Sequence, residues 1–284
     1  METAKVAQPI SGDKLYQERA RRALPLLVRQ AQASAKIYYS DLADELGMVN
    51  PRNLNFVLGS VGQALQRLSS EWGEQVPPLQ CLVVNKATGL PGEGVGWFIK
   101  GLENYASLSR KQQRDIVKAE LLKISSYPKW QEVLSAFGLK PVAADYSALL
   151  KQASNFRGGG ESEEHRSLKD YVAGHPELLN LPRSTSQGTT EYRLPSGDSL
   201  DVLFRAGDDW IAVEVKSHRS APDDIVRGLF QCIKYRAVIE AYQAAERLPQ
   251  NARAVLILGG ALPDHLIPLK NILEVEVMDN VVPA

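Results

Sequence analysis

The chain has 284 residues, of which 44% are hydrophobic and 23% charged, enough for one large domain or two ordinary ones. Lysine plus arginine and aspartate plus glutamate balance at 33 each, which argues against a purely electrostatic nucleic-acid binder, since such proteins tend to be basic. The sequence has no run of about 18 apolar residues, so no membrane span is expected.

The cysteines and the first residues bear on the compartment. Two cysteines occur, Cys81 and Cys232, and they offer neither a disulfide framework nor a thiolate metal site. Residues 1–14 are polar and lack the apolar core of a signal peptide. We therefore expect a cytoplasmic protein that does not contact a membrane.

The first hundred residues predict helices at apolar spacings of three and four. These helices run over residues 13–34, 40–47 and 52–70. Ser40 is a good N-cap and Gly47 a good stop for the second helix. The tight turn between the second and third helices resembles a helix-turn-helix.

A strand over 79–84 and a possible return strand over 95–99 would complete a winged-helix-like domain over residues 13–100. In that arrangement the start of the third helix faces a groove of nucleic acid, through Arg52, Asn53 and Asn55. The alternative is a protein contact, because helix-turn-helix shapes often mediate one and this region has no dense basic patch.

The middle of the chain predicts a helical connector and linker over residues 101–160. A helical stretch from 110 to 138 is interrupted at Pro128, and we expect the flexible joint at the run Gly158-Gly159-Gly160.

The last part, 161–280, predicts an α/β fold with a mixed central sheet flanked by helices. The expected helices cover 162–173, 222–246 and 264–271, and the expected strands cover 190–194, 199–206, 209–216, 253–258 and 273–278.

A hairpin from Ser199 to Lys216 carries the chemistry. If Gly207-Asp208 forms its two-residue turn, positions that sum to 415 lie opposite each other. Three apolar pairs then share one face: Leu200 with Val215, Val202 with Val213, and Phe204 with Ile211. On the other face Asp201 lies across from Glu214, and Lys216 is two residues further along.

Opposed carboxylates repel unless a positive charge lies between them. Mg²⁺, or Mn²⁺, suits such oxygen ligands, because it takes one or two carboxylates plus water and phosphate oxygens. Lys216 could then orient or deprotonate a water, or neutralise charge on a phosphate. The pattern of Asp201, Glu214 and Lys216 therefore indicates metal-assisted phosphodiester hydrolysis.

These residues resemble the PD-(D/E)xK nuclease superfamily, whose fold is restriction-endonuclease-like. Its signature is an acidic residue on one strand and Glu-x-Lys on the next, here Asp201 and Glu214-Val215-Lys216. The resemblance covers about residues 161–278, and the position before Asp201 is leucine where the signature has proline. It implies that Asp201 and Glu214 hold metal and that Lys216 is catalytic.

The family adds an acidic residue on the preceding helix. Glu164 shares a helical face with Leu168 and Tyr171, so we expect it to be the third metal ligand, with Glu161 as the next choice. Glu163 falls on the wet face. RecB-type members also carry Gln-x-x-x-Tyr on the helix after the lysine strand. Gln231 and Tyr235 match that motif on one helical face, which implies that they support the site and contact nucleic acid.

We therefore expect a metal-dependent DNA nuclease that serves prokaryotic restriction or phage defence. Duplex cleavage needs two centres, so a homodimer is plausible, and a defence-system partner protein is a further option. The alternative is a non-catalytic DNA-binding regulator or adaptor with a degenerate nuclease fold. The plainest interpretation is a surface hairpin in which Lys216 forms an ordinary salt bridge.

Overall fold

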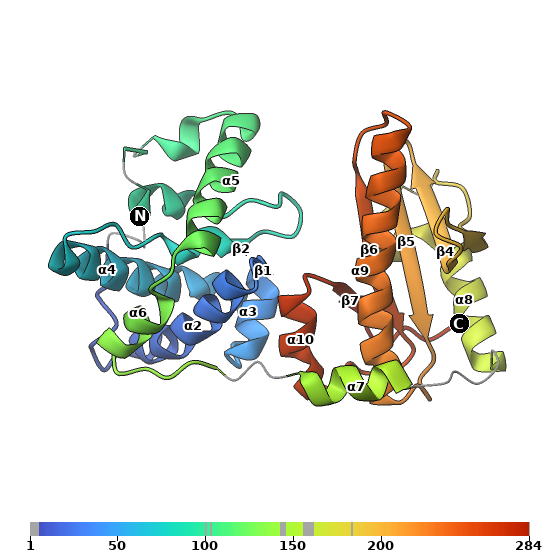
Figure 1. Ribbon diagram of the computed structural model, residues 1–284, viewed down its shortest axis with the longest axis horizontal. Helices are drawn as coiled ribbons and strands as arrows, with labels where there is room; N and C mark the ends of the chain where they lie inside the picture. Colours follow the sequence, from blue (N-terminus) through green and yellow to red (C-terminus); the bar gives the residue numbers. More distant parts are fainter. Residues whose placement is uncertain are drawn as a thin grey trace. The chain divides into compact units, whose positions relative to one another are not determined.

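The computed structural model describes residues 6–99, 101–102, 104–142, 146–155, 162–182 and 184–283. The chain divides into two compact units, Met1–Ala144 and Asp145–Ala284 (Figure 1). The first is mainly helical and the second is a mixed sheet packed with helices, so the chain is α/β. In the described ranges, no helix has both the length and the apolar character needed to cross a membrane.

The first unit packs its helices around one hydrophobic core. Its α-helices are α2 (Leu15–Gln32), α3 (Tyr39–Glu45), α4 (Leu54–Trp72), α5 (Arg110–Ser126) and α6 (Trp130–Ala136). Its two short strands, β1 (Ile37–Tyr38) and β2 (Val83–Val84), pair in parallel. Its 3-10 helices are η1 (Pro51–Asn53), η2 (Leu79–Leu82), η3 (Glu93–Phe98) and η4 (Tyr105–Ser107).

The three predicted helices of this unit are confirmed as α2, α3 and α4. Gly47 follows α3 with φ of 65°, as a helix stop should. The expected N-cap, Ser40, is wrong: α3 begins one residue earlier, and its N-cap is Tyr38. Tyr38 is also the last residue of β1, so the chain passes from strand to helix without a spacer.

The return strand expected over 95–99 is wrong, because the chain forms the 3-10 helix η3 there. Only Val83 and Val84 of the strand expected over 79–84 are extended, and they pair with β1. At Gly96 a Cβ atom would lie 2.6 Å from Cβ of Tyr105 and 2.8 Å from the carbonyl oxygen of Leu102. This close packing requires glycine and folds the segment inward, so the described residues contain no hairpin wing here.

The residues assigned to a helical connector contribute to the first core. The helical break at Pro128 is confirmed, because α5 ends at Ser126 and α6 begins at Trp130. Ile124, Trp130 and Leu134 are at most 3% exposed and belong to the same core as α2 and α4. A helix that the sequence analysis did not anticipate, α7 (Ser147–Asn155), lies in the second unit. The expected glycine joint at 158–160 lies outside the described residues.

The second unit has a five-stranded sheet in the order β3-β4-β5-β6-β7. Its strands are β3 (Thr189–Arg193), β4 (Ser199–Ala206), β5 (Asp209–Lys216), β6 (Ala252–Leu258) and β7 (Glu276–Met278). The first three pair antiparallel, and β5, β6 and β7 pair in parallel. The expected mixed sheet is therefore confirmed.

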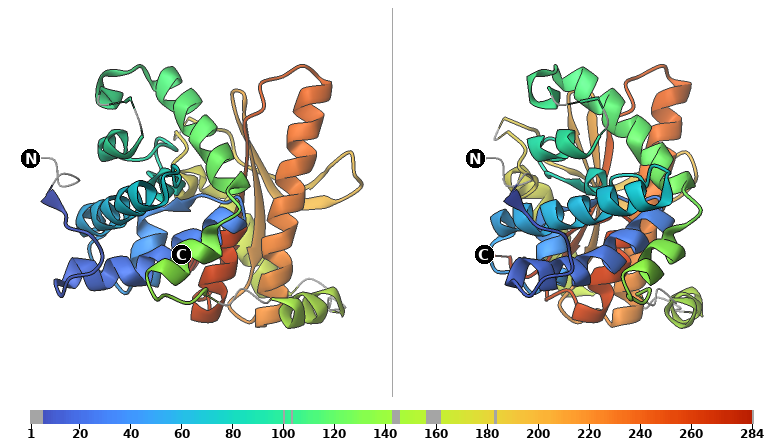
Figure 2. Two further views of the ribbon diagram at one scale, coloured as in Figure 1. Left: turned by 60° about the vertical axis from the view of Figure 1, so that its left-hand side comes forward. Right: turned by 90° about the vertical axis from the view of Figure 1, so that its left-hand side faces the viewer.

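Helices cover both faces of this sheet. They are α8 (Glu163–Gly174), α9 (Pro222–Ala245) and α10 (Ile267–Ile272), with the 3-10 helices η5 (Pro176–Leu179) and η6 (Asp264–Leu266). Val202 and Val213 pack with α8, whereas their neighbours Leu203 and Ala212 pack with α9. Successive strand residues point to opposite faces, so α8 and α9 lie on opposite sides. Figure 2 shows α9 running alongside the strands, and it contacts β5 and β6.

Candidate metal and catalytic site

The hairpin of β4 and β5 has the register that the sequence predicts. The paired residues run from Val202 with Val213 to Ala206 with Asp209, and the numbers of each pair sum to 415. Gly207 has φ of 64°, the left-handed conformation that the turn requires. The register brings Asp201 and Glu214 to the same end of the hairpin.

One detail of the expected hairpin is wrong, because Leu200 does not pack with Val202 and Phe204. Val202 and Phe204 belong to the core beneath α8, whereas Leu200 belongs to the core beneath α9. The alternation along β4 therefore breaks between Leu200 and Val202, where Asp201 lies. Both faces of the hairpin are also core, since seven of the eight residues of β5 are buried.

The break coincides with an irregular residue on β3. Glu191 lies between the pairs Thr190–Val202 and Tyr192–Leu200, so it is opposite Asp201. Its φ is 52°, a conformation that residues with a side chain rarely adopt. The carboxylate of Asp201 accepts a hydrogen bond of 2.7 Å from the amide of Val215 on β5. At this point of the sheet, the Val215 amide thus donates to the Asp201 side chain and not to a backbone carbonyl.

Glu214 and Lys216 form a buried cluster against α9. Nζ of Lys216 lies 3.0 Å from Oε1 of Glu214 and 3.1 Å from Oδ1 of Asp224, in the first turn of α9. Only 8% of the Lys216 side chain and 5% of the Glu214 side chain are exposed. Gly228 on α9 leaves room for the lysine, because a Cβ there would lie 3.2 Å from Cε of Lys216. Two carboxylates and one glycine therefore fix the lysine.

The tyrosine and glutamine of α9 lie on one helical face, as their spacing predicts. The Tyr235 hydroxyl is 3.1 Å from Oε2 of Glu214 and 3.2 Å from the carbonyl oxygen of Ser199. Nε2 of Gln231 donates to the same hydroxyl at 3.1 Å. Oε1 of Gln231 is buried and has no hydrogen-bond partner in the described part of the chain. An orphaned acceptor therefore lies next to the Tyr235–Glu214 pair.

Burial and like charge set the electrostatics of this cluster. Burial, and then the charge of Asp201, raise the pKa of Glu214 to about 7, although Lys216 and Tyr235 act to lower it. Burial acts to lower the pKa of Lys216, but Glu214 and Asp224 outweigh it, so the net pKa is raised. Burial and the Glu214 carboxylate also raise the pKa of Tyr235. A second cation near Asp201 and Glu214 would therefore relieve an existing repulsion.

Glu164 has the exposure expected of it but engages another partner. It is half-buried whereas Glu163 is exposed, as the helical face predicts. Its Oε1 lies 2.8 Å from Nη1 of Arg219. A hydrogen bond from its own amide holds its pKa below the usual value, with help from Ser162 and Arg219, although burial acts to raise it. The other candidate, Glu161, lies outside the described residues.

The residue of α8 that approaches Asp201 is His165 and not Glu164. Its Nε2 lies 3.4 Å from Oδ1 of Asp201, and the side chains are 21% and 16% exposed. The bond to Asp201 raises the pKa of His165, although burial acts to lower it. The sequence did not single out His165, because the pattern sought on this helix was a third carboxylate. Helical spacing offered a signal, since His165, Lys169 and Val172 fall on one face.

Asp224 is the second residue that the sequence analysis missed. It sits two residues after Pro222, where a carboxylate is favourable to a helix, so its position in the sequence indicates only an ordinary first-turn role. Its contact with Lys216 depends on where α9 packs against β5, which no local pattern reveals. Within the described ranges, no group of three or more His, Cys, Asp or Glu side chains converges to form a metal-binding site.

The expected nucleic-acid contacts of the first unit lie on its surface. Arg52 and Asn53 belong to η1, and Asn55 lies in the first turn of α4. All three are exposed, and Phe56 beside them is 38% exposed. The structure thus presents these residues at the start of α4, in the second helix of the predicted turn.

Comparisons of the chain with protein-family models, with curated proteins and with solved structures found no match.

Proposed function

We propose that the second unit is a metal-dependent DNA nuclease that hydrolyses phosphodiester bonds. One observation carries the proposal: two carboxylates and one ammonium, from Asp201, Glu214 and Lys216, gather at one end of the β4–β5 hairpin. The buried Glu214 has a pKa of about 7, and such shifted values cluster at functional sites. An ordinary surface salt bridge would not bury the lysine to 8% exposure.

The donor set at this end of the hairpin fits Mg²⁺ or Mn²⁺ bound largely through water. Asp201 and Glu214 supply carboxylate oxygens, and one or two carboxylates are a usual protein contribution to such a site. The buried Oε1 of Gln231, which has no hydrogen-bond partner among the described residues, is placed to accept a hydrogen bond from an ordered water. When bound, the cation would lower the pKa of a coordinated water and polarise the phosphate.

The other residues have roles that follow from their contacts. Lys216 carries a positive charge that Glu214 and Asp224 hold in place, and it would stabilise negative charge on the attacked phosphate or assist the water. Tyr235 binds Oε2 of Glu214 and leaves Oε1 to the lysine, and Gln231 orients the tyrosine. Glu164 would join the metal only by leaving Arg219.

The first unit would position the DNA, with Arg52, Asn53 and Asn55 contacting it. Their exposure at the start of α4 supports this assignment. Cleavage of both strands of a duplex would require two centres, which a homodimer would supply. We place the activity in prokaryotic restriction or phage defence, where a partner protein of the same system could control it.

A second function is a non-catalytic DNA-binding regulator or adaptor with a degenerate nuclease fold. Two observations favour it: no group of three metal-ligand side chains converges in the described ranges, and Glu164 is paired with Arg219. This alternative predicts that DNA binding persists without cleavage under every metal.

The two functions differ in a cleavage assay. Plasmid and linear DNA are incubated with Mg²⁺, with Mn²⁺ and with EDTA, beside an Asp201→Asn variant. Asparagine keeps an oxygen that can accept from the Val215 amide, so the fold should survive. An Asp198→Asn variant is the control, because the Asp198 carboxylate pairs with the exposed Lys234 and not with Glu214 or Lys216. Metal-dependent cutting that only Asp201→Asn abolishes supports the nuclease, and binding without cutting by the unmodified protein contradicts it.

A further inference from the structure

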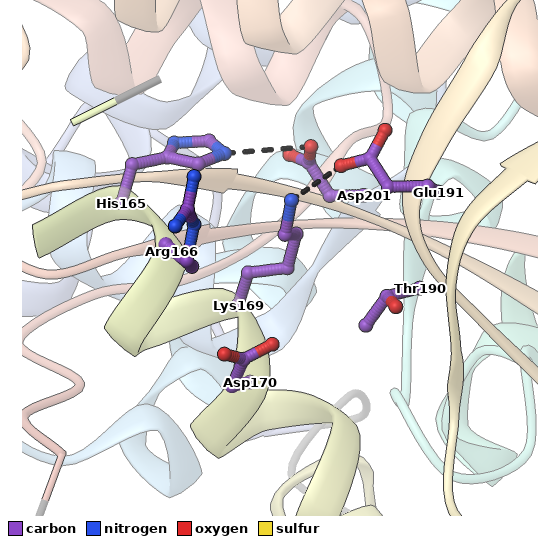
Figure 3. Close-up of a pocket in the computed structure, with 7 residues that line it drawn as sticks. All are labelled: His165, Arg166, Lys169, Asp170, Thr190, Glu191 and Asp201. Carbon is purple, nitrogen blue, oxygen red and sulfur yellow. Dashed lines mark hydrogen bonds and ion pairs between the residues drawn. The ribbon is translucent and has the colours of Figure 1, made fainter. Parts of the chain in front are cut away.

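A pocket of about 490 Å³ opens beside Asp201, on the side of the sheet that α8 covers. All of its lining residues are polar: His165, Arg166, Lys169, Asp170, Thr190, Glu191 and Asp201. In Figure 3, His165 and Lys169 project from α8 toward Asp201 and Glu191. The Asp201 carboxylate therefore borders this pocket, where it lies 3.4 Å from Nε2 of His165.

Lys169 is the unusual residue of the pocket. Its side chain is only 5% exposed, yet its ammonium pairs with Glu191, which is 60% exposed. Glu191 reaches the lysine from a backbone with φ of 52°. The fold thus holds an ammonium at the wall of an open pocket, next to a carboxylate that is largely exposed to water.

The charges around the pocket point to the same kind of ligand. By formal charge, Arg166 and Lys169 contribute two positive charges and Asp170, Glu191 and Asp201 three negative ones, so the lining is negative by one when His165 is counted as neutral. With a divalent cation on Asp201 the same lining becomes positive by one. A metal-loaded pocket would therefore attract an anion to the side of Asp201 where Lys169 lies.

We propose that this pocket binds a backbone phosphate of the DNA strand next to the one that is cut, and that Lys169 is its principal contact. On binding, the ammonium of Lys169 exchanges Glu191 for the phosphate, and Arg166 adds a second cationic contact at the rim. The proposal rests on the proposed nuclease function and deepens it, because it states where the strand continues beyond the reacting phosphate. It also assigns Glu191 the role of a competitor for the lysine.

The test measures DNA binding by fluorescence anisotropy, with a short fluorescein-labelled duplex, in EDTA and in Ca²⁺. A gel run afterwards verifies that the duplex is intact. Lys169→Met removes the charge and keeps the stem, Lys169→Arg keeps the charge, and Glu191→Gln removes the competitor. Arg253→Gln is the matched control, because Arg253 is also half of an ion pair in this unit, with Glu276 at 3.0 Å.

We expect Lys169→Met to weaken binding in Ca²⁺ about tenfold, because a hydrogen bond between charged groups is lost. The slope of log affinity against log salt should fall by about 0.9, which corresponds to one phosphate contact. Glu191→Gln should tighten binding, whereas Lys169→Arg and Arg253→Gln should leave it within about twofold. A purely structural ion pair predicts instead that Lys169→Met and Glu191→Gln both lower the melting temperature and leave affinity unchanged.

The outcomes separate this inference from the nuclease itself. If the unmodified protein cuts DNA and neither Lys169→Met nor Glu191→Gln changes affinity, the phosphate pocket is overturned and the nuclease stands. If the two variants shift affinity in opposite directions and no metal supports cutting, the pocket stands and the nuclease does not. If Lys169→Met fails to fold, unchanged affinity of Glu191→Gln overturns the pocket. A protein that neither binds nor cuts DNA overturns both.

Discussion

Replacing Glu214 with glutamine should make the metal-free protein more stable at pH 8 than the unmodified protein. The folded state raises the pKa of Glu214 to about 7 from an ordinary 4.5, through burial and the charge of Asp201. Between these values the folded chain holds a proton that the unfolded chain has lost. Stability from this group is therefore fully present below about pH 4.5 and is lost as the pH rises through about 7.

The size of the effect follows from the same values. Each pH unit between about 4.5 and about 7 is worth about 1.4 kcal/mol, so the loss is about 3 kcal/mol. Glutamine resembles the protonated side chain and removes this dependence. The pKa of His165 is also raised, so this residue too makes the folded state less stable as the pH rises. This effect largely cancels when the unmodified protein is compared with Glu214→Gln.

The assay is urea unfolding in EDTA at a series of pH values from 5 to 8, for the unmodified protein and Glu214→Gln. The transition of the second unit is identified by loss of the sheet signal in circular dichroism. We expect the variant to be more stable by about 3 kcal/mol at pH 8 and by less than about 1 kcal/mol at pH 5. Parallel pH dependences would refute the argument that Glu214 is a buried acid strained by Asp201.

Three further substitutions test the packing around the site. Asp224→Asn should lower kcat of DNA cleavage about tenfold and leave KM unchanged, with partial recovery in Asp224→Glu, because Asp224 positions Lys216 without touching substrate. Gly228→Ala should lower cleavage while changing the free energy of unfolding by less than about 2 kcal/mol, because gained helix propensity offsets contacts at 2.9 Å to Leu256 and 3.2 Å to Lys216. Phe204→Ala should cost about 3–5 kcal/mol in urea unfolding, since the ring is 1% exposed, and a cost below about 1 kcal/mol would contradict the core assignment.

Local patterns were sufficient to predict most of the second unit. The register of β4 and β5 follows from alternating apolar residues and one Gly-Asp turn, and both signals lie within the hairpin itself. The pairing of Gln231 with Tyr235 follows from helical spacing in the same way. These features need no knowledge of distant segments.

What the sequence could not predict depends on distant segments. The break at Asp201 is set by Glu191 on β3 and by the Val215 amide, so it becomes visible only when three strands are assembled. Glu164 is on the predicted face but is held by Arg219, from the loop after β5. In the first unit, the expected strand over 95–99 failed because Gly96 packs against Tyr105, a contact that periodicity cannot reveal.

The most direct test of the central claim is Mn²⁺ binding followed by electron paramagnetic resonance, without DNA. The account predicts one saturable site in the unmodified protein, loss of that site in both Asp201→Asn and Glu214→Gln, and its retention in Asp198→Asn. Equal Mn²⁺ binding by all four proteins, or none by the unmodified protein up to millimolar metal, would contradict a metal centre at Asp201 and Glu214.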